Sequence, residues 1–338
     1  MKQKIAIILQ NLGGPDSPEA VRPFLYNLFA DPAILTYTSP FRQLLAWLIS
    51  SLRYQKAKKI YEKIGGKSPL LENTNLQAQA LKISLEKLLP ESIVEVFLAM
   101  RYWHPFTHET VQKVKEFKPE KVVVLPLYPQ FSTTTSASSL KLWQKLFKEK
   151  ISQKTVCCYP VEPGFIKAYQ DLIVQEIAKV PENLPLRLLF SAHGLPQKIV
   201  DQGDPYAFQV EQSVASIMGR TLSTYEHQIC YQSKVGPLQW LGPSLEQSIE
   251  EAAKDKKAII VVPVSFVSEH SETLVELDID FKERAKSLGI PYYGRVPAVS
   301  THPDFINGLA HLTLKYLTET VSDLKPICNG NYEKCWCR

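Results

Sequence analysis

The sequence predicts an α/β protein of two similar halves, each built on a four-stranded parallel sheet flanked by helices. Two observations predict this fold class. Short runs rich in β-branched residues alternate with amphipathic helical stretches, a pattern typical of parallel sheets. The chain of 338 residues, 45% hydrophobic and 22% charged, is long enough to bury two cores of ordinary size and has a globular composition.

The predicted strands form two sets of four. They span residues 5–9, 93–99, 121–127 and 155–159 in the first half, and residues 186–190, 226–231, 258–264 and 291–296 in the second. Prolines near the strand ends recur between the halves: Pro105, Pro126 and Pro160 have counterparts in Pro237, Pro263 and Pro297, at offsets of 132, 137 and 137 residues. The similar offsets indicate a duplicated fold, although two unrelated α/β domains can show such spacing by chance.

The first pair of strands breaks this regular spacing. Pro15 recurs as Pro196 at an offset of 181 residues, so the first half carries about 45 additional residues between its first two strands. We expect domains at residues 1–160 and 161–310, with an apolar insertion at about 31–73 in the first. A C-terminal helix and a cysteine-bearing tail are expected at 311–338.

Composition and missing motifs exclude several classes of function. A balance of 39 Lys+Arg against 34 Asp+Glu gives a charge of only +5, which argues against a nucleic-acid partner. No G-x-G-x-x-G, G-x-x-x-x-G-K-[ST] or G-x-S-x-G motif is present, so we expect no nucleotide cofactor and no hydrolase elbow. No apolar run reaches membrane-spanning length, and the first strand begins without a signal segment, so we expect a cytoplasmic chain.

The candidate chemistry lies just beyond predicted strands, where parallel sheets bind ligands. His193 directly follows one of these strands, although a lone histidine is more often structural than catalytic. Four carboxylates follow another strand at helical spacing: Glu269, Glu272, Glu276 and Asp280. No Lys or Arg occurs between Val264 and Lys282. This acidic stripe is either a solvated helix face or, with His193, a loose site for a divalent metal and for proton transfer.

The insertion has an apolar helix followed by basic residues. The apolar side chains are Phe41, Leu44, Leu45, Trp47, Leu48, Ile49 and Leu52, and the segment after them holds Arg53, Lys56, Lys58 and Lys59. Apolar residues occupy nearly the whole circumference of this helix. It is therefore expected to pack against the domain core, a flat hydrophobic ligand or a bilayer interface.

Seven segments, in order along nearly the whole chain, resemble ferrochelatase, the enzyme family that inserts ferrous iron into a porphyrin in haem synthesis. The matching segments begin at Leu9-Gln10-Asn11-Leu12-Gly13-Gly14-Pro15, Ile64-Gly65-Gly66-Lys67-Ser68-Pro69, Arg101-Tyr102-Trp103-His104-Pro105, Tyr128-Pro129-Gln130-Phe131-Ser132, Ser191-Ala192-His193-Gly194-Leu195-Pro196, Gln232-Ser233-Lys234-Val235-Gly236-Pro237 and Ser268-Glu269-His270-Ser271-Glu272. The resemblance implies two Rossmann-like, chelatase-like domains with the porphyrin held between them.

The resemblance also implies roles for individual residues. It makes His193 and Glu272 the catalytic and metal-contacting pair, with Glu269, Glu276 and Asp280 as a path for protons or metal. The porphyrin-binding residues that it implies are Leu12, Tyr61, Ser68, Arg101, Tyr102, Ser132 and Trp240. Under this hypothesis neutral His193 accepts a pyrrole proton and binding energy bends the macrocycle. The side from which iron enters stays open.

Two features refine the resemblance. The first loop carries Asn11-Leu12, a form associated with protoporphyrin IX more than with coproporphyrin III. Many members of the family also hold a [2Fe-2S] cluster, for which the tail cysteines Cys328, Cys335 and Cys337, with Cys157 or Cys158, are the candidates. Their C-x6-C-x-C spacing is unfamiliar, so thiols without a cluster or a zinc site remain alternatives.

Other functions remain open on the sequence alone. Besides Fe²⁺ and protoporphyrin IX as substrates, the same fold class includes coproporphyrin III ferrochelatases and cobalt or nickel chelatases. A haem carrier without turnover is the non-enzyme alternative. The apolar helix and its basic neighbours would also suit peripheral contact with a membrane, and no oligomeric state is predicted.

Overall fold

The computed structural model describes residues 2–234, 236–320, 327–328 and 332–337. These residues form two compact units. The first draws on residues within 1–158, 309–327 and 336–338, and the second on residues within 159–308 and 328–335. The chain therefore returns to the first unit after residue 308, contributes residues within 328–335 to the second, and ends in the first.

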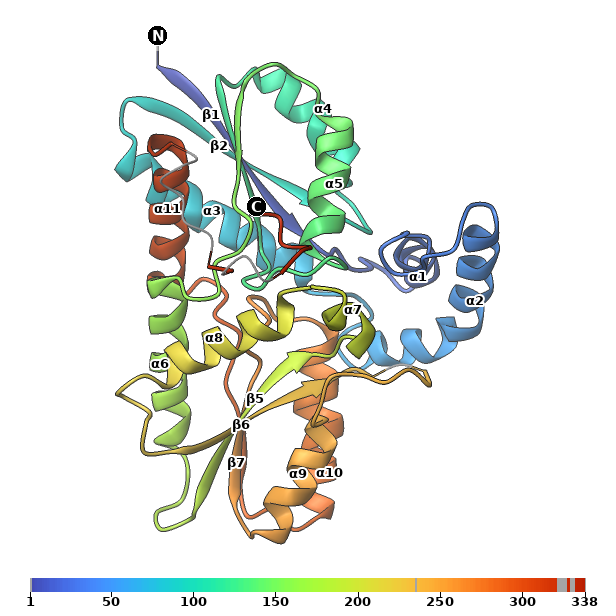
Figure 1. The fold of residues 1–338 in the computed structure, drawn as a ribbon, viewed down its shortest axis with the longest axis vertical. Coiled ribbons are helices and arrows are strands. Elements are labelled where there is room, and N and C mark those ends of the chain that lie inside the picture. The colour runs from blue at the N-terminus through green and yellow to red at the C-terminus, as the bar shows by residue number, and fades with distance from the viewer. Residues whose placement is uncertain (1, 235, 321–326, 329–331, 338) are drawn as a thin grey trace. The chain divides into compact units, whose positions relative to one another are not determined.

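The first unit is built on a four-stranded, all-parallel sheet in the order β2-β1-β3-β4. Its strands are β1 (Gln3–Asn11), β2 (Ser92–Met100), β3 (Lys121–Pro126) and β4 (Ser152–Thr155). Its helices are α1 (Val21–Phe29), α2 (Phe41–Glu62), α3 (Leu70–Leu88), α4 (Thr107–Phe117) and α5 (Ser136–Leu146). Figure 1 shows α4 and α5 together beside this sheet, and α2 well away from it.

Alternation along the central strand builds the first core. Ala6 and Ile8 of β1 face a cluster that includes Val114 of α4 and Trp143 of α5. Successive side chains of a strand point to opposite faces, so the neighbouring Ile5, Ile7 and Leu9 point to the other side of the sheet, and all three are buried. Burial on both faces is the expected state of a parallel sheet covered by helices.

The second unit repeats this topology in the order β6-β5-β7-β8, again all parallel. Its strands are β5 (Leu186–His193), β6 (Glu226–Gln232), β7 (Ala258–Val262) and β8 (Tyr293–Arg295). Its helices are α6 (Pro163–Ile177), α7 (Gln197–Asp201), α8 (Tyr206–Met218), α9 (Leu245–Lys254), the π-helix η1 (Glu272–Phe281) and α10 (Lys282–Ser287); the last helix, α11 (Pro303–Thr318), begins here. In Figure 1, α9 and α10 lie on one side of this sheet and α6 and α8 on the other.

The predicted fold class is confirmed: two four-stranded parallel sheets are flanked by helices, in the same strand order. Seven predicted strands are confirmed, with ends that shift by no more than three residues. The prediction of a strand at 155–159 was wrong, because β4 ends at Thr155. Pro126 at the end of β3 has no N–H for a longer ladder. The apolar side chains of Val156 and Tyr159 are nevertheless buried.

Candidate active site

The second sheet brings His193 and Glu272 together at its carboxyl end. His193 is the last residue of β5, and Glu272 is the first residue of η1 in the segment that follows β7. Strands β5 and β7 are neighbours, whereas β6 lies on the other side of β5. The pair therefore lies where the strand order reverses, which is the preferred ligand site of open parallel sheets.

The two side chains are joined by a hydrogen bond of 2.8 Å between His193 Nδ1 and Glu272 Oε2. They are 41% and 30% exposed, so the pair is open enough to reach a ligand. This bond leaves Nε2 as the ring nitrogen of His193 that is not committed to Glu272. The arrangement combines an imidazole that can accept a proton, that of His193, with a carboxylate that orients this imidazole, that of Glu272.

Charge coupling shifts the pKa values of the two groups in opposite directions. Burial alone would lower the pKa of His193, but the negative charge and hydrogen bond of Glu272 outweigh it and raise that pKa above its usual value. Burial would raise the pKa of Glu272, but His193 opposes this effect and holds it at about 2. The carboxylate therefore stays ionised and the imidazole gains proton affinity.

A second carboxylate, Glu276, is fixed by the loop that follows β6. Its carboxylate accepts hydrogen bonds from the backbone N–H of Ser233, at 3.1 Å, and from the Ser233 hydroxyl, at 2.7 Å. The same hydroxyl lies 3.1 Å from Glu272 Oε2. Burial and the neighbouring charge of Glu272 raise the pKa of Glu276. Glu276 is thus suited to exchange protons, whereas Glu272 stays charged.

The π-helix places these carboxylates along one line. Hydrogen bonds from residue i to i+5 widen each turn beyond the 3.6 residues of an α-helix, so residues four apart stay on one face. The sequence pattern suggested an ordinary helix with Glu272, Glu276 and Asp280 on one face. The observed segment from Glu272 to Phe281 is a π-helix, an element that occurs frequently at functional sites.

The expectation of a continuous acidic stripe that no basic residue neutralises was wrong. Glu269 forms an ion pair of 2.5 Å with Arg295 and also accepts a hydrogen bond from the N–H of Ala298. Arg295, which lies on β8, also pairs with Asp278. Attraction to Arg295 outweighs burial and lowers the pKa of Glu269. Glu269 therefore supports the structure around the site, and Asp280 lies exposed further along η1.

His270 and Trp240 lie next to the pair. His270 Nδ1 accepts a hydrogen bond of 3.0 Å from the N–H of Glu272, and burial lowers the pKa of His270 despite the nearby carboxylates. The ring of Trp240 packs on Gly194, where an added Cβ would lie 3.2 Å from it. The predicted ligand residue Trp240 is thus beside His193.

In the first unit, the predicted residues Arg101 and Tyr102 belong to a buried polar network that follows β2. Arg101 pairs with Asp31 at 2.8 Å and donates from Nε to Ser138 at 2.8 Å. Tyr102 is buried and its hydroxyl donates to Asp31 at 2.7 Å. Burial, reinforced by Asp31, raises the pKa of Tyr102. Tyr102 is therefore enclosed within the network, whereas Arg101 keeps part of its surface exposed.

The remaining predicted porphyrin residues lie in several places of the first unit. Leu12 follows β1, and its carbonyl accepts from the N–H of Tyr102 at 2.9 Å. Ser68 is buried against Gly14, and its N–H donates to Pro15 at 2.7 Å. Tyr61, on α2, and Ser132, after β3, are both buried. Leu12 and Ser68 are thus tied to the end of β1 together with the Arg101 network.

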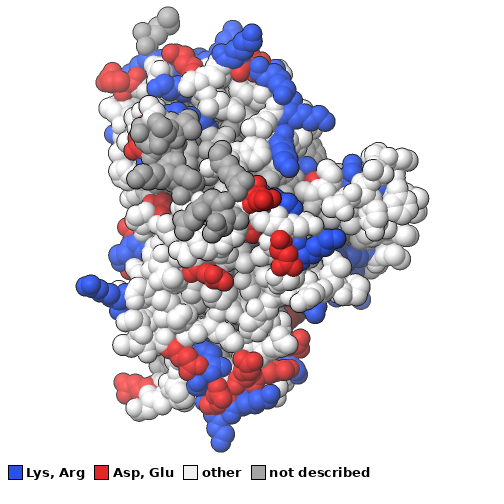
Figure 2. All heavy atoms as spheres, in the orientation of Figure 1, with Lys and Arg blue, Asp and Glu red and all other residues white. Residues whose placement is uncertain are grey.

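The helix α2 presents most of its apolar side chains outward, whereas Leu45 and Ile49 are half-buried. Phe41, Leu44, Trp47, Leu48 and Leu52 are all exposed, Leu52 by 74%. In Figure 2 the region where Figure 1 draws α2 is mostly white, so few charged side chains interrupt it. Among the described residues, no helix is both long and apolar enough to span a bilayer. The apolar surface of α2 is therefore a face that a ligand or an interface would cover.

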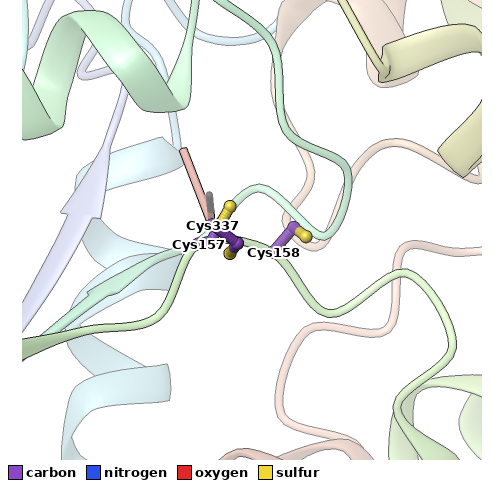
Figure 3. A group of neighbouring side chains, drawn as sticks. All are labelled: Cys157, Cys158 and Cys337. Atoms are coloured by element: carbon purple, nitrogen blue, oxygen red, sulfur yellow. The ribbon is translucent and has the colours of Figure 1, made fainter. Parts of the chain in front are cut away.

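Within the part of the chain that the structure describes, two groups of side chains have donor sets suited to metals. The Sγ atoms of Cys157, Cys158 and Cys337 lie within 4.8 Å of one another. Figure 3 shows the three side chains as neighbours. Of the cysteines named from the sequence, both alternatives Cys157 and Cys158 belong to this group together with Cys337, whereas Cys328 and Cys335 belong to the second unit. The other group is formed by Asp171, His302 and Asp304.

Residues that sequence reasoning did not single out hold the site in place. They are Ser233 beneath the two glutamates, Arg295 beside Glu269, and Asp31 and Ser138 around Arg101. Ser233 lies in a segment that carried the resemblance and has a left-handed φ of 64°, which a sequence pattern does not indicate. The others are far in sequence from the groups that they hold.

The fold is the α/β fold of solved chelatase structures. SirB from Bacillus subtilis with Fe³⁺ matches with a TM-score of 0.52 at 12% identity, covering 94% of this chain and 96% of that one. CbiX, the terminal enzyme for biosynthesis of sirohaem in denitrifying bacteria, matches with a TM-score of 0.50 at 13% identity, covering 94% and 100%. At these identities the likeness is one of fold.

The family follows from the sequence comparisons. The ferrochelatase family model matches residues 4–317. Ferrochelatases of Caulobacter vibrioides (strain NA1000 / CB15N) and Rickettsia bellii (strain OSU 85-389) are each 47% identical to this chain. The alignments cover 100% of this chain and 99% of the first relative, and 99% of this chain and 96% of the second. The chain belongs to the ferrochelatase family, the metal chelatases that insert ferrous iron into a porphyrin in haem synthesis.

Proposed function

We propose that this enzyme inserts Fe²⁺ into protoporphyrin IX to give protohaem, with His193 and Glu272 as its catalytic pair. The observation that carries the proposal is the hydrogen-bonded pair at the strand-order reversal of the second sheet, with its opposed pKa shifts. The Asn11-Leu12 loop after β1 favours protoporphyrin IX over coproporphyrin III.

Metallation replaces two pyrrole protons by one Fe²⁺, so the site must remove two protons as the metal binds the ring nitrogens. His193 in its neutral form accepts a pyrrole proton at Nε2, and Glu272 stabilises the imidazolium that results. The raised pKa of His193 makes the ring a stronger base but reduces its neutral fraction at a given pH. Turnover should therefore rise as pH increases through that pKa.

The remaining carboxylates serve the transfer of protons and metal. Glu276 has a raised pKa, and Ser233 places its carboxylate next to that of Glu272. It is therefore suited to take a proton onward from the pair, and the exposed Asp280 continues this path along η1. Glu269 forms an ion pair with Arg295. In this proposal it therefore stabilises the start of the π-helix and does not transfer protons or metal.

The first unit contributes groups for the macrocycle. The guanidinium of Arg101 suits a propionate. Leu12 and Ser132 follow the carboxyl ends of β1 and β3, and Ser68, between α2 and α3, packs against Gly14 after β1. Tyr61 and Tyr102 are buried, so their proposed part is to shape the wall behind these groups. Trp240, packed against Gly194 in the second unit, offers an aromatic surface for the ring.

The test is anaerobic Fe²⁺ insertion into protoporphyrin IX and coproporphyrin III, measured side by side with the wild type and His193→Ala. We expect repeated turnover, a higher kcat/KM for protoporphyrin IX, and loss of most turnover in the variant. A preference for coproporphyrin III contradicts the substrate assignment. Wild-type turnover in His193→Ala contradicts the base assignment, and stoichiometric haem binding without turnover identifies a carrier.

We further propose that the enzyme works in the cytoplasm and touches a membrane peripherally through α2. The support is the row of exposed apolar side chains together with Lys56, Lys58 and Lys59 further along the same helix. Apolar side chains insert at the boundary between headgroups and acyl chains, and lysines attract anionic lipids. Such a contact suits a porphyrin that is poorly soluble in water.

We propose that Cys158 and Cys337 of the first unit are ligands of a [2Fe-2S] cluster, for which the resemblance also implies Cys328 and Cys335. Thiolates are the ligands of such clusters, and the mutual approach of Cys157, Cys158 and Cys337 fits a thiolate-bound group. Cys157 and Cys158 both belong to that group, so Cys157 is the alternative to Cys158 as the ligand beside Cys337. When bound, the cluster would supply one-electron redox chemistry, which metallation with Fe²⁺ does not need.

A further inference from the structure

Asp31 is a buried carboxylate at which three side-chain donors meet. It follows α1 and is only 3% exposed. Its Oδ2 accepts from Arg101 Nη2 at 2.8 Å, from the Tyr102 hydroxyl at 2.7 Å and from the Ser138 hydroxyl. Its Oδ1 accepts from the N–H of Ala33 at 2.8 Å. Both carboxylate oxygens are therefore satisfied, as a buried charge requires.

This network holds the Arg101 guanidinium in one orientation. Nε donates to Ser138 at 2.8 Å and Nη2 pairs with Asp31, while the guanidinium lies 5.0 Å from the Tyr102 ring centroid. Among the described residues, Nη1 has no hydrogen-bond partner, and the side chain keeps 17% exposure. One edge of the guanidinium is thus fixed by the protein and the other remains available as a donor.

We propose that Asp31 is a positioning residue, which holds Arg101 so that its Nη1 edge donates to a carboxylate of the porphyrin. The inference rests on the proposed contact between Arg101 and the substrate. Asp31 also balances the charge of Arg101. Arg101 therefore contributes to porphyrin binding through a directed hydrogen bond to the carboxylate more than through net charge attraction. A guanidinium held in advance loses little conformational freedom when the carboxylate binds.

A structural role for Asp31 would have a different consequence. If Asp31 only stabilised the loop after α1, its loss would weaken the binding of every porphyrin alike. If it positions Arg101, its loss weakens only porphyrins that carry an ionised carboxylate. The dimethyl ester of protoporphyrin IX keeps the macrocycle and removes both carboxylate charges, so comparing it with the free acid separates the two roles.

The experiment measures KM and kcat for iron insertion into protoporphyrin IX and its dimethyl ester, in the same detergent, with the wild type and Asp31→Asn. We expect KM for the free acid to rise about tenfold, because a factor of this size corresponds to the loss of roughly one charge-assisted hydrogen bond. KM for the ester and kcat should stay within about twofold. An unchanged KM for the acid, or an equal rise for both substrates, overturns the proposal.

Matched variants complete the design. Asp201→Asn, at an exposed aspartate of α7, should leave both KM values unchanged. Ser138→Ala removes the partner of Arg101 Nε and provides a second test if Asp31→Asn does not fold; an increase selective for the acid supports the proposal and its absence overturns it. Arg101→Ala tests the underlying contact: if acid and ester respond alike while insertion persists, Arg101 does not bind a carboxylate.

Discussion

At the scale of single residues, the central feature is a histidine whose proton affinity is set by its neighbours. His193 is partly buried, which by itself favours the neutral ring, yet the charge of Glu272 at 2.8 Å and the further charge of Glu276 favour the imidazolium. The opposing effect on Glu272 keeps its pKa at about 2. Opposed shifts in a titratable pair are a mark of acid–base function.

Replacing Glu272 should therefore change the titration of His193 in a known direction. In Glu272→Gln the attraction is lost while burial remains, so the pKa of His193 should fall and its neutral fraction at a given pH should rise. NMR titration of the imidazole signals measures this, with His193→Ala to assign the resonance. Glu250→Gln, at a carboxylate of α9 that pairs with Arg284, should leave the pKa unchanged. An unchanged or higher pKa in Glu272→Gln contradicts the coupling.

At the scale of elements, close approach between backbone segments fixes the loop after β1. A Cβ on Gly14 would lie 2.4 Å from the Ser68 hydroxyl oxygen, which is too close for any non-bonded pair. The N–H of Ser68 also donates to Pro15. The segment that joins α2 to α3 is thus attached to the end of the central strand, and Gly14 is the residue that permits it.

The variant Gly14→Ala should accordingly destabilise the protein. We expect a loss of about 1–3 kcal/mol in the free energy of unfolding, because an added methyl group in a filled site displaces its neighbours. Urea unfolding measures the change. Gly242→Ala is the matched control, since no atom lies within 4 Å of an added Cβ there. Equal free energies of unfolding for the two variants would contradict this prediction, because they would show that Ser68 can move away from an added methyl group without destabilising the protein.

The exposed apolar face of α2 makes a second prediction at this scale. Trp47→Glu places a charge within that face, so binding to vesicles of mixed zwitterionic and anionic lipid should fall several-fold. Flotation with such vesicles measures it. Leu76→Glu is the control, because Leu76 is a similarly exposed apolar residue on α3. Equal flotation of the wild type and Trp47→Glu would contradict the proposal that α2 contacts the membrane.

At the scale of the whole molecule, one topology occurs twice and carries different groups. Both sheets are parallel with the same strand order, and both place candidate functional residues at the carboxyl ends of their strands. The second unit holds His193 and the glutamates, whereas the first holds the Arg101 network and the apolar helix α2. In the proposed function, the repeated scaffold therefore separates the acid–base pair from groups suited to the macrocycle.

Cys337, near the end of the chain, lies next to Cys157 and Cys158, which follow β4. If they hold an iron–sulfur cluster, anaerobically purified protein should absorb in the visible range and contain iron and acid-labile sulfide. Cys337→Ser should lose the colour, whereas Cys230→Ala should keep it, because Cys230 is buried within the second unit. Colourless wild-type protein with neither iron nor sulfide would exclude the cluster.

The sequence was sufficient for the features that depend on local pattern. Apolar runs ended by turn residues gave seven of eight strands, since burial of a parallel strand leaves a periodic trace in the chain. The seven segments named from the sequence pointed to the family, because each is a contiguous run of residues that can be recognised without the fold. A buried run such as Val156 to Tyr159 carries the same signal without joining the sheet, which explains the eighth.

By itself, then, the sequence determined two α/β halves, a candidate histidine with nearby carboxylates, and membership of the ferrochelatase family. The tertiary structure decided which charges are paired. It assigned Glu269 to Arg295 on β8, placed Glu276 on Ser233, and brought Asp31 to Arg101. These contacts join residues far apart in the chain, and only the folded backbone fixes their distances, so no local pattern of residue types encodes them.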